Sequence, residues 1–205
     1  MQGRPIRVKT LGHGPRRVFF IGGIHGDENE GSYAAEQLPD AFAKAGIADR
    51  VTLTLLEDAN PDGRAAATRT NANGVDLNRN FPARNFDPSD PVGGSRPLNQ
   101  PESRLVVNII DYVKPQLVIV MHSWIDREFI NYDGPATDLA QRFSAASSIP
   151  LTESSSFAPT PGSLGSYVGR DLGIPVLTVE LRKGSDPSMD WGKVHSALLQ
   201  AILGQ

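Results

Sequence analysis

The sequence predicts an α/β fold, namely a single three-layer domain over residues 1–205 in which helices flank a mostly parallel mixed β-sheet. First, short apolar runs typical of buried strands alternate with stretches whose apolar residues recur at helical spacing. Second, a hydrophobic content of 39% in 205 residues is enough for a substantial core. Third, no internal repeat, linker or low-complexity segment divides the chain.

In the first half of the chain, apolar runs and helix formers alternate before a long polar stretch begins. Gly22 and Gly23 end the first buried run by permitting a sharp turn, and Gly46 is a natural helix terminator. Pro39 is expected to shorten or kink the intervening helix. A loop as long as the polar stretch is usually functional in a compact domain. We therefore expect, in order, an edge strand at residues 5–9, a buried strand at 18–21, a helix at 32–45, a strand at 51–56 and a loop at 57–99.

The second half of the chain repeats this alternation. Pro101 and Glu102 suit the first turn of a helix whose apolar residues form one stripe. Two further apolar runs, each followed by a polar residue, have the pattern of buried parallel strands. We expect a helix at residues 101–113, a strand at 117–121, helices at 136–146 and 163–171, a strand at 176–179 and a closing helix at 191–203.

Composition and charge exclude several functional classes. The net charge of −3, the isoelectric point near 5.8 and the scattered Lys and Arg residues argue against nucleic-acid binding. No apolar run approaches the roughly 20 residues of a membrane helix, and the N-terminus lacks the apolar core of a signal peptide, so we expect a cytoplasmic protein. The chain has no cysteine, so a zinc ion would need His and carboxylate ligands. The oligomeric state stays open.

Polar residues of catalytic type follow the ends of the expected strands. In open α/β sheets the ligand site lies beyond the carboxyl ends of the strands, so side chains at these positions meet at one edge of the sheet. The residues at the successive strand ends are His25 and Glu28, the loop at Asn60, His122 and Glu180.

Three of these residues make up the ligand set of a catalytic zinc ion: His25, Glu28 and His122. Such sites use three protein ligands and keep the fourth position for water. Zinc lowers the pKa of bound water to about 7, and a carboxylate that is not a ligand must then accept the proton and pass it to the leaving amine. Glu180 is the candidate for this role. Taken singly, the four residues also fit ordinary surface positions or a hydrogen-bonded core histidine.

The long polar loop adds donors to the expected site, namely Arg69, Asn78 and Arg79. An anionic tetrahedral intermediate and a terminal carboxylate both need guanidinium or amide donors, and arginine offers a planar fork for them. Each arginine could instead be a solvated surface charge. Asp76 could orient a ligand histidine or stabilise a turn.

The motifs that contain these residues form an ordered set over residues 18–182. They are His25-Gly26-Asp27-Glu28, Asn60-Pro61-Asp62-Gly63, Arg69, Gly74-Val75-Asp76-Leu77-Asn78-Arg79-Asn80-Phe81, His122 and Thr178-Val179-Glu180-Leu181. This set resembles the zinc carboxypeptidase (funnelin, carboxypeptidase A-like) family. The resemblance implies a hydrolase with one zinc ion on His25, Glu28 and His122, with Glu180 as general base and acid. It further implies that Arg69 stabilises the oxyanion and that Asn78 and Arg79 hold the carboxylate of the residue removed.

Two later stretches sharpen the resemblance within that family. Residues 131–136 and 159–167 look like those of bacterial murein tripeptide amidases, which cut the γ-D-glutamyl to meso-diaminopimelate bond in recycled cell-wall peptides. The resemblance implies a small peptide substrate, such as a murein tripeptide. Leu164 falls where the family reads the departing side chain, although an apolar residue does not by itself explain recognition of diaminopimelate.

One position departs from the family pattern. Digestive members carry a mobile tyrosine at the place of Phe157, and a phenylalanine cannot donate a hydrogen bond. Either the phenol is dispensable, or Tyr132 or Tyr167 approaches from elsewhere.

Two other functions compete with a peptidase. An N-acyl amino-acid deacylase of the aspartoacylase and succinylglutamate desuccinylase type shares a similar His-x-x-Glu pair, but such proteins usually carry an added C-terminal β domain, and only 25 residues follow Glu180. A non-catalytic protein that binds cell-wall peptides would keep the pocket, but it would not need the proton-transferring Glu180.

Overall fold

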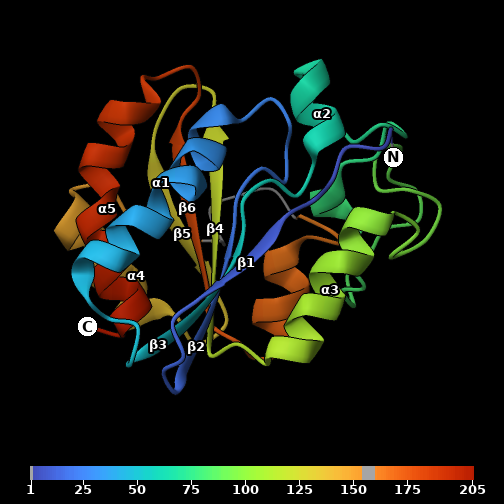
Figure 1. The fold of residues 1–205 in the computed structure, drawn as a ribbon. Helices are drawn as coiled ribbons and strands as arrows, with labels where there is room; N and C mark the ends of the chain where they lie inside the picture. Colours follow the sequence, from blue (N-terminus) through green and yellow to red (C-terminus); the bar gives the residue numbers. More distant parts are fainter. Residues whose placement is uncertain (1, 154–159) are drawn as a thin grey trace.

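Six strands form one mixed β-sheet in the computed structural model, which describes residues 2–153 and 160–205 (Figure 1). The strand order is β1-β3-β2-β4-β6-β5; the four inner strands run parallel, and the edge strands β1 and β5 run antiparallel to their neighbours. The predicted α/β class is therefore confirmed. The elements are β1 Val8–Leu11, β2 Arg16–Ile21, α1 Asn29–Ala45, β3 Val51–Leu56, α2 Pro61–Ala66, η1 Leu77–Arg79, α3 Pro101–Val113, β4 Leu117–Trp124, β5 Phe129–Asp133, α4 Thr137–Ser147, η3 Gly165–Asp171, β6 Val176–Arg182 and α5 Pro187–Leu203.

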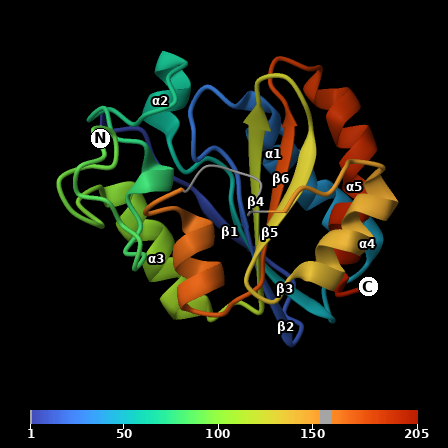
Figure 2. The ribbon, with the colours of Figure 1, turned by 180° about the vertical axis from the view of Figure 1, so that it is seen from behind.

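Helices cover both faces of the sheet, which gives the three layers (Figures 1 and 2). Successive side chains of a strand point to opposite faces, so the apolar runs of the inner strands feed two separate clusters. Ile119 and Met121 pack with α1, α4 and α5 on one face, whereas Val118 and Val120 pack with α3 and η3 on the other. The continuous apolar runs in the sequence thus mark strands buried on both faces.

Two inner strands extend further than the sequence predicts. The apolar run of β4 ends at Met121, and that of β6 ends at Val179, so the sequence places His122 and Glu180 just past or at the strand ends. In the structure both residues lie inside their strands, because the parallel pairing continues through His122 with Glu180 to Trp124 with Arg182. Backbone hydrogen bonds do not depend on the side chain, so a strand can continue past the end of its apolar run.

The strand β5 and the helix α2 are absent from the sequence-based prediction. β5 is only five residues long and includes Asn131 and Asp133, and its pairing with β6 makes it an edge strand. α2 lies within the predicted loop, with Pro61 in its first turn and the Asn60 side chain accepting the Gly63 N–H at 3.0 Å. Asparagine before proline is a recognisable helix start, so this signal was present in the sequence.

The helix α1 begins earlier than predicted and runs through Pro39 to Ala45. Leu38 and Phe42 on either side of the proline are buried in the core. Their packing outweighs the loss of one helical hydrogen bond.

Polar side chains hold the long loop after β3 in place. The Asn80 amide donates to the carbonyl of Gly93 at 2.8 Å and to Asn99 Oδ1 at 2.7 Å, and its own oxygen accepts the backbone N–H of Gln100 at 3.2 Å. These bonds fix the loop at its middle and at its end, so residues 76–79 reach the sheet edge in a defined conformation. Within the part of the chain that the structure describes, no helix has the length and apolar character needed to cross a bilayer.

Candidate metal centre and active site

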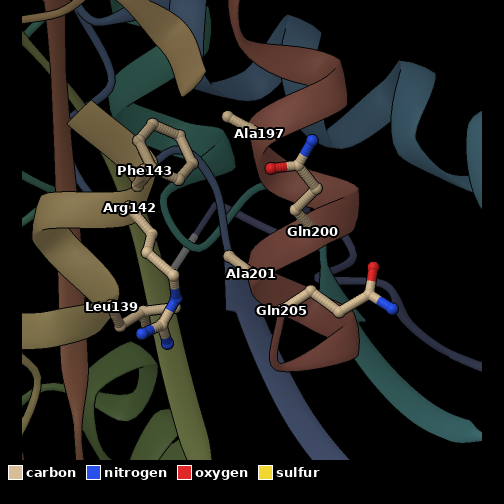
Figure 3. A pocket seen from close by; sticks show the side chains of 7 residues that line it. All are labelled: Leu139, Arg142, Phe143, Ala197, Gln200, Ala201 and Gln205. Carbon is tan, nitrogen blue, oxygen red and sulfur yellow. The ribbon is translucent and has the colours of Figure 1, made fainter. Parts of the chain in front are cut away.

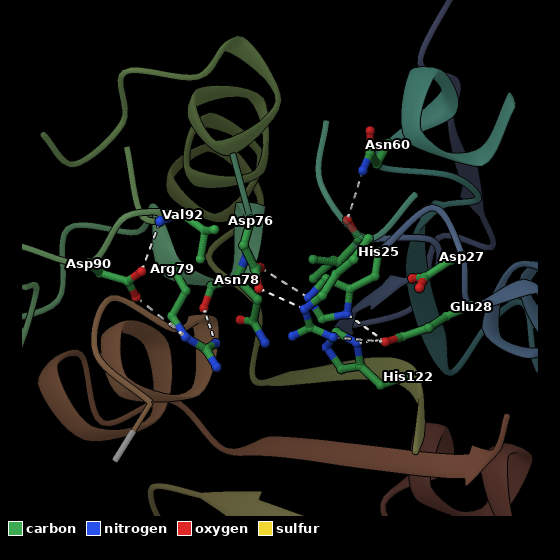
Figure 4. Close-up of polar contacts among 12 residues, drawn as sticks. His25, Asp27, Glu28, Asn60, Asp76, Asn78, Arg79, Asp90, Val92 and His122 are labelled. Atoms are coloured by element: carbon green, nitrogen blue, oxygen red, sulfur yellow. Dashed lines mark hydrogen bonds and ion pairs between the residues drawn. The ribbon is translucent and has the colours of Figure 1, made fainter. Parts of the chain in front are cut away.

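The turn after β2 is held against α2, and this fixes the position of His25. A Cβ atom at residue 26 would lie 2.0 Å from the carbonyl carbon of Gly63, so only glycine fits there. The Asn60 amide donates to the carbonyl of Ile24 at 3.3 Å and closes the same turn (Figure 4). The Asn-Pro-Asp-Gly motif therefore fixes the turn that carries His25.

The structure brings together the three residues expected to bind zinc (Figure 4). The Glu28 carboxylate lies between the two imidazoles, with Oε1 2.8 Å from His25 Nδ1 and Oε2 2.9 Å from His122 Nδ1. One donor atom from each of the three residues lies within 4.8 Å of the others, and each residue is only 3% exposed. Two imidazole nitrogens and a carboxylate oxygen thus converge on one buried point.

Asp76 contacts the outer side of this cluster and does both things that the sequence left open. Its Oδ1 lies 3.1 Å from His25 Nε2 and accepts the Asn78 backbone N–H at 2.8 Å, so one atom orients the imidazole and stabilises the turn at η1. Its Oδ2 accepts from Arg69 Nε at 2.9 Å. Asp76 thus holds the imidazole so that Nδ1, on the other side of the ring, faces Glu28.

The chemistry of this set fits zinc. Zinc accepts imidazole nitrogen and carboxylate oxygen at about 2.0–2.2 Å, and ligand histidines normally donate their other ring N–H to a carboxylate. Asp76 occupies that second position on His25. His25, Glu28 and His122 would hold the ion through two imidazole nitrogens and one carboxylate oxygen.

In the metal-free cluster, the histidines and the carboxylates shift each other's pKa values in opposite directions. Burial by itself would lower the pKa of His25, but the carboxylates of Glu28 and Asp76 raise it to about 9. Burial opposes ionisation of Glu28, but His122 and His25 hold its pKa far below the ordinary range. The carboxylates of the cluster therefore favour a positive charge beside them, and a proton on His25 supplies it when no metal is bound.

This pKa shift predicts how the stability of the metal-free protein depends on pH. The folded pKa of His25 lies above its ordinary value of 6.5, so protonated His25 adds stability that is complete below that value and is lost as pH rises through about 9. We expect the melting temperature of metal-free protein to fall between about pH 6 and pH 10, as measured by circular dichroism. Zinc-loaded protein should lack most of this fall, because metal binding requires neutral imidazole.

Glu180 lies directly across from His122 in the β4–β6 pairing, on the same face of the sheet. Its Oε2 is buried and has no hydrogen-bond partner among residues 2–153 and 160–205. Burial raises the pKa of the Glu180 carboxyl, and the nearby His122 partly offsets this effect. A buried acceptor of this kind calls for a donor from outside the described chain, such as water or a substrate.

Arg69 lies at the metal cluster, where Nη1 is 3.3 Å from Glu28 Oε1. Its guanidinium is half-exposed and so can be reached by a substrate. Asn78 and Arg79 lie beyond Asp76, to one side of the two histidines (Figure 4). Arg79 donates to the carbonyl of Asn78 at 2.8 Å and pairs with Asp90 at 4.0 Å. The structure thus places Arg69 against the cluster and Asn78 and Arg79 to one side of it.

The structure places Leu164 in the apolar core, only 1% exposed, at the start of η3. Its backbone N–H donates to Asn78 Oδ1 at 2.9 Å, so it positions that amide through the main chain. Its role in reading the departing side chain stays a prediction, as little of its surface is available.

The position of the family tyrosine, Phe157, lies outside the described residues. Of the two possible substitutes, Tyr132 packs against the cluster on the α1 face of the sheet, opposite to the face of Glu180. Tyr167 of η3 packs on the same face as Glu180. Only Tyr167 therefore shares a layer with the catalytic candidates.

The sequence analysis assigns no role to four residues near the ligands, which the structure shows in contact: Asp27, Glu30, Ser123 and Lys183. Ser123 donates its backbone N–H to Glu28 Oε2 at 3.1 Å and its hydroxyl to Glu30 at 2.5 Å. On the rim, Lys183 pairs with Asp27 at 2.5 Å. Each of these lies within three residues of a predicted site residue, and that proximity was the available signal.

A shallow hollow between α4 and α5 (Figure 3) lies on the opposite side of the sheet from Glu180. Apolar side chains such as Phe143 line it together with Arg142 and Gln200. None of the predicted site residues lines this hollow. It is therefore separate from the metal cluster.

Comparisons with known proteins agree with this geometry. A family profile described as zinc carboxypeptidase matches residues 1–156. The chain is 31% identical over 181 residues to murein peptide amidase A of Escherichia coli strain K12, a match that covers 79% of this chain and 69% of the relative. The crystal structure of murein-tripeptide amidase MpaA from Escherichia coli O157 superposes with a TM-score of 0.72 at 23% identity, covering 98% of this chain and 94% of that one. A metallo-carboxypeptidase from Burkholderia cenocepacia superposes with a TM-score of 0.77 at 22% identity, over 99% and 61% of the two chains.

Proposed function

Because this chain belongs to the zinc carboxypeptidase family and is a zinc-dependent hydrolase, we propose that it cleaves an amide bond next to a residue with a free carboxylate. One observation carries this proposal. Glu180 lies opposite His122 on the neighbouring strand, and its buried Oε2 has no hydrogen-bond partner among the described residues. A metal site and a free proton acceptor on adjacent strands are the two requirements of hydrolysis by activated water.

Each residue has a defined task in this proposal. His25, Glu28 and His122 would hold the zinc ion, which would supply the Lewis acid of the reaction. Glu180 takes one proton from the attacking water and gives it to the leaving amine, so that one water is consumed and one carboxylate and one amine are released. Its raised pKa suits a group that must both accept and donate near neutral pH.

Arg69 supplies a donor to the reacting carbonyl, and Asn78 and Arg79 supply donors to the carboxylate of the departing residue. The half-exposed guanidinium of Arg69 stabilises the negative oxygen that develops there. Asn78 Oδ1 is occupied by the backbone N–H of Leu164, which turns the amide nitrogen toward the substrate. Arg79 binds the carboxylate of the departing residue with its planar fork. The substrate then extends from the His25–Glu28–His122 cluster toward Arg79.

The leading substrate is a murein peptide with a γ-D-glutamyl to meso-diaminopimelate bond. The similarity to murein peptide amidases supports it. The departing diaminopimelate would supply the free carboxylate for Arg79, with Leu164 behind that subsite. In this proposal residues 1–205 form one catalytic domain.

A substrate panel tests the proposal on zinc-loaded protein. It contains a γ-D-glutamyl-diaminopimelate tripeptide, ordinary peptides with a free C-terminus, and N-acetyl and N-succinyl amino acids. Release of diaminopimelate is the expected result. Cleavage of the N-acyl amino acids alone would favour the deacylase, and binding of the tripeptide without any cleavage would favour a non-catalytic binding protein.

Replacing Arg79 by glutamine should weaken recognition of the departing residue. A hydrogen bond to a charged group contributes about 1.5–3 kcal/mol, so kcat/KM should fall roughly 10- to 150-fold, mainly through KM. Steady-state kinetics on the cleaved peptide measure this change. A peptide amidated at the carboxylate is the control, because its cleavage should be poor in both proteins. An equal loss on both peptides would contradict the assignment.

A further inference from the structure

Glu30 is a buried carboxylate two residues beyond the ligand Glu28, in the first turn of α1. It is only 4% exposed, and both of its oxygens are used. Oε2 accepts the hydroxyl of Ser123 at 2.5 Å, and Oε1 accepts the backbone N–H of Gly184 at 2.6 Å. The two donors come from different segments, so this one side chain joins three parts of the fold.

These two donors adjoin the two strands that carry the catalytic candidates. Ser123 follows His122 in β4, and its backbone N–H donates to Glu28 Oε2 at 3.1 Å. Ser123 is therefore held between Glu28 and Glu30 by its N–H and its hydroxyl. Gly184 lies in the loop that follows β6, the strand of Glu180. Glu30 consequently fixes the ends of β4 and β6 against the start of α1.

The Glu30 carboxyl has no ion-pair partner in the part of the chain that the structure describes. No Lys, Arg or His nitrogen lies within ion-pair distance of it among the residues that the structure describes. Buried charges in proteins are normally paired or lie at a metal.

We propose that Glu30 is a positioning residue for the metal centre, which acts through Ser123 on Glu28 and His122 and through Gly184 on the strand of Glu180. The inference rests on the proposed zinc site. Outer partners of metal ligands typically change metal affinity by about 10- to 100-fold. Glu30 touches neither metal nor substrate in this role, so it should affect zinc affinity and kcat and leave KM unchanged.

The test compares Glu30→Gln with Glu36→Gln in the full chain. Glutamine keeps the shape of the side chain but replaces one acceptor oxygen by a donor, so it cannot accept from both Ser123 and Gly184. Glu36 is on the same helix, but its side chain is 45% exposed and pairs with Arg64. Zinc affinity is measured by competition with a chromophoric chelator. We expect zinc binding about 10- to 100-fold weaker in Glu30→Gln and unchanged in Glu36→Gln.

A second variant separates positioning from loss of folding. Ser123→Ala removes the hydroxyl that reaches Glu30 but keeps the backbone N–H on Glu28, so it should also weaken zinc binding. The double variant should be no weaker than the stronger single one, because both changes break the same contact. Melting temperatures of the metal-free proteins report any general loss of stability.

Equal zinc affinity in wild type, Glu30→Gln and Ser123→Ala would overturn the inference. The same holds if KM rises while zinc affinity stays constant. If Glu30→Gln does not fold, Ser123→Ala decides alone. Failure of the wild type itself to bind zinc would instead refute the proposed function, so the two failures are distinguishable.

Discussion

Replacing Glu180 by glutamine is expected to lower kcat by about 10²- to 10⁴-fold while zinc and peptide remain bound. Glutamine has nearly the same shape but cannot accept a proton and return it to the leaving amine. The ligands His25, Glu28 and His122 are unchanged, so metal content should stay at one zinc per chain. Pre-steady-state and steady-state kinetics on the cleaved peptide, together with metal analysis, measure both quantities.

The matched control for this change is Glu36→Gln on the exposed side of α1. It alters charge and volume by the same amount away from the site and should leave kcat unchanged. Undiminished turnover in Glu180→Gln would remove Glu180 from the mechanism. A loss of zinc in that variant would instead assign Glu180 to the ligand shell.

Removing zinc is expected to abolish hydrolysis and to destabilise the fold. A ligand at about 1,000 times its dissociation constant stabilises the folded state by about 4.1 kcal/mol. At about 2–4 °C per kcal/mol for a chain of this length, the melting temperature should fall by roughly 8–16 °C on chelation. Adding zinc back should restore both activity and stability.

The variant His122→Ala should mimic chelation and should no longer respond to added zinc. It removes one of three ligands and leaves Glu28 Oε2 without its imidazole neighbour. His13→Ala is the control, because His13 is exposed in the turn before β2. A zinc-dependent rise in melting temperature that survives in His122→Ala would place the metal elsewhere.

The sequence alone locates most of the candidate site because of how a parallel sheet is built. Strand ends of one direction share an edge, so His25, Glu28 and His122 meet even though they come from distant segments. Asp76 also follows from chemistry, because a ligand histidine needs an acceptor on its second nitrogen. Asp76 both orients a histidine and stabilises a turn, because one of its oxygens contacts His25 and accepts the Asn78 N–H.

Other features depend on tertiary pairing that leaves little trace in the sequence. β5 is short and half polar, and it becomes a strand only because the open edge of β6 accepts it. Glu30 looks like an ordinary helix residue favoured near an N-terminus. Its partners, Ser123 and Gly184, lie 93 and 154 residues away, so no local pattern reveals the contact.

The metal cluster depends on the pairing of β2 with β4. Glu28 and His122 are 94 residues apart in the chain and become neighbours only when these two strands lie side by side. Bringing such distant segments together carries a loop-closure cost that must be met before the contacts form. The complete metal site therefore exists only after the central sheet has formed. We therefore expect zinc to slow unfolding of the finished fold more than it speeds folding, because it stabilises contacts that are complete only in the folded sheet.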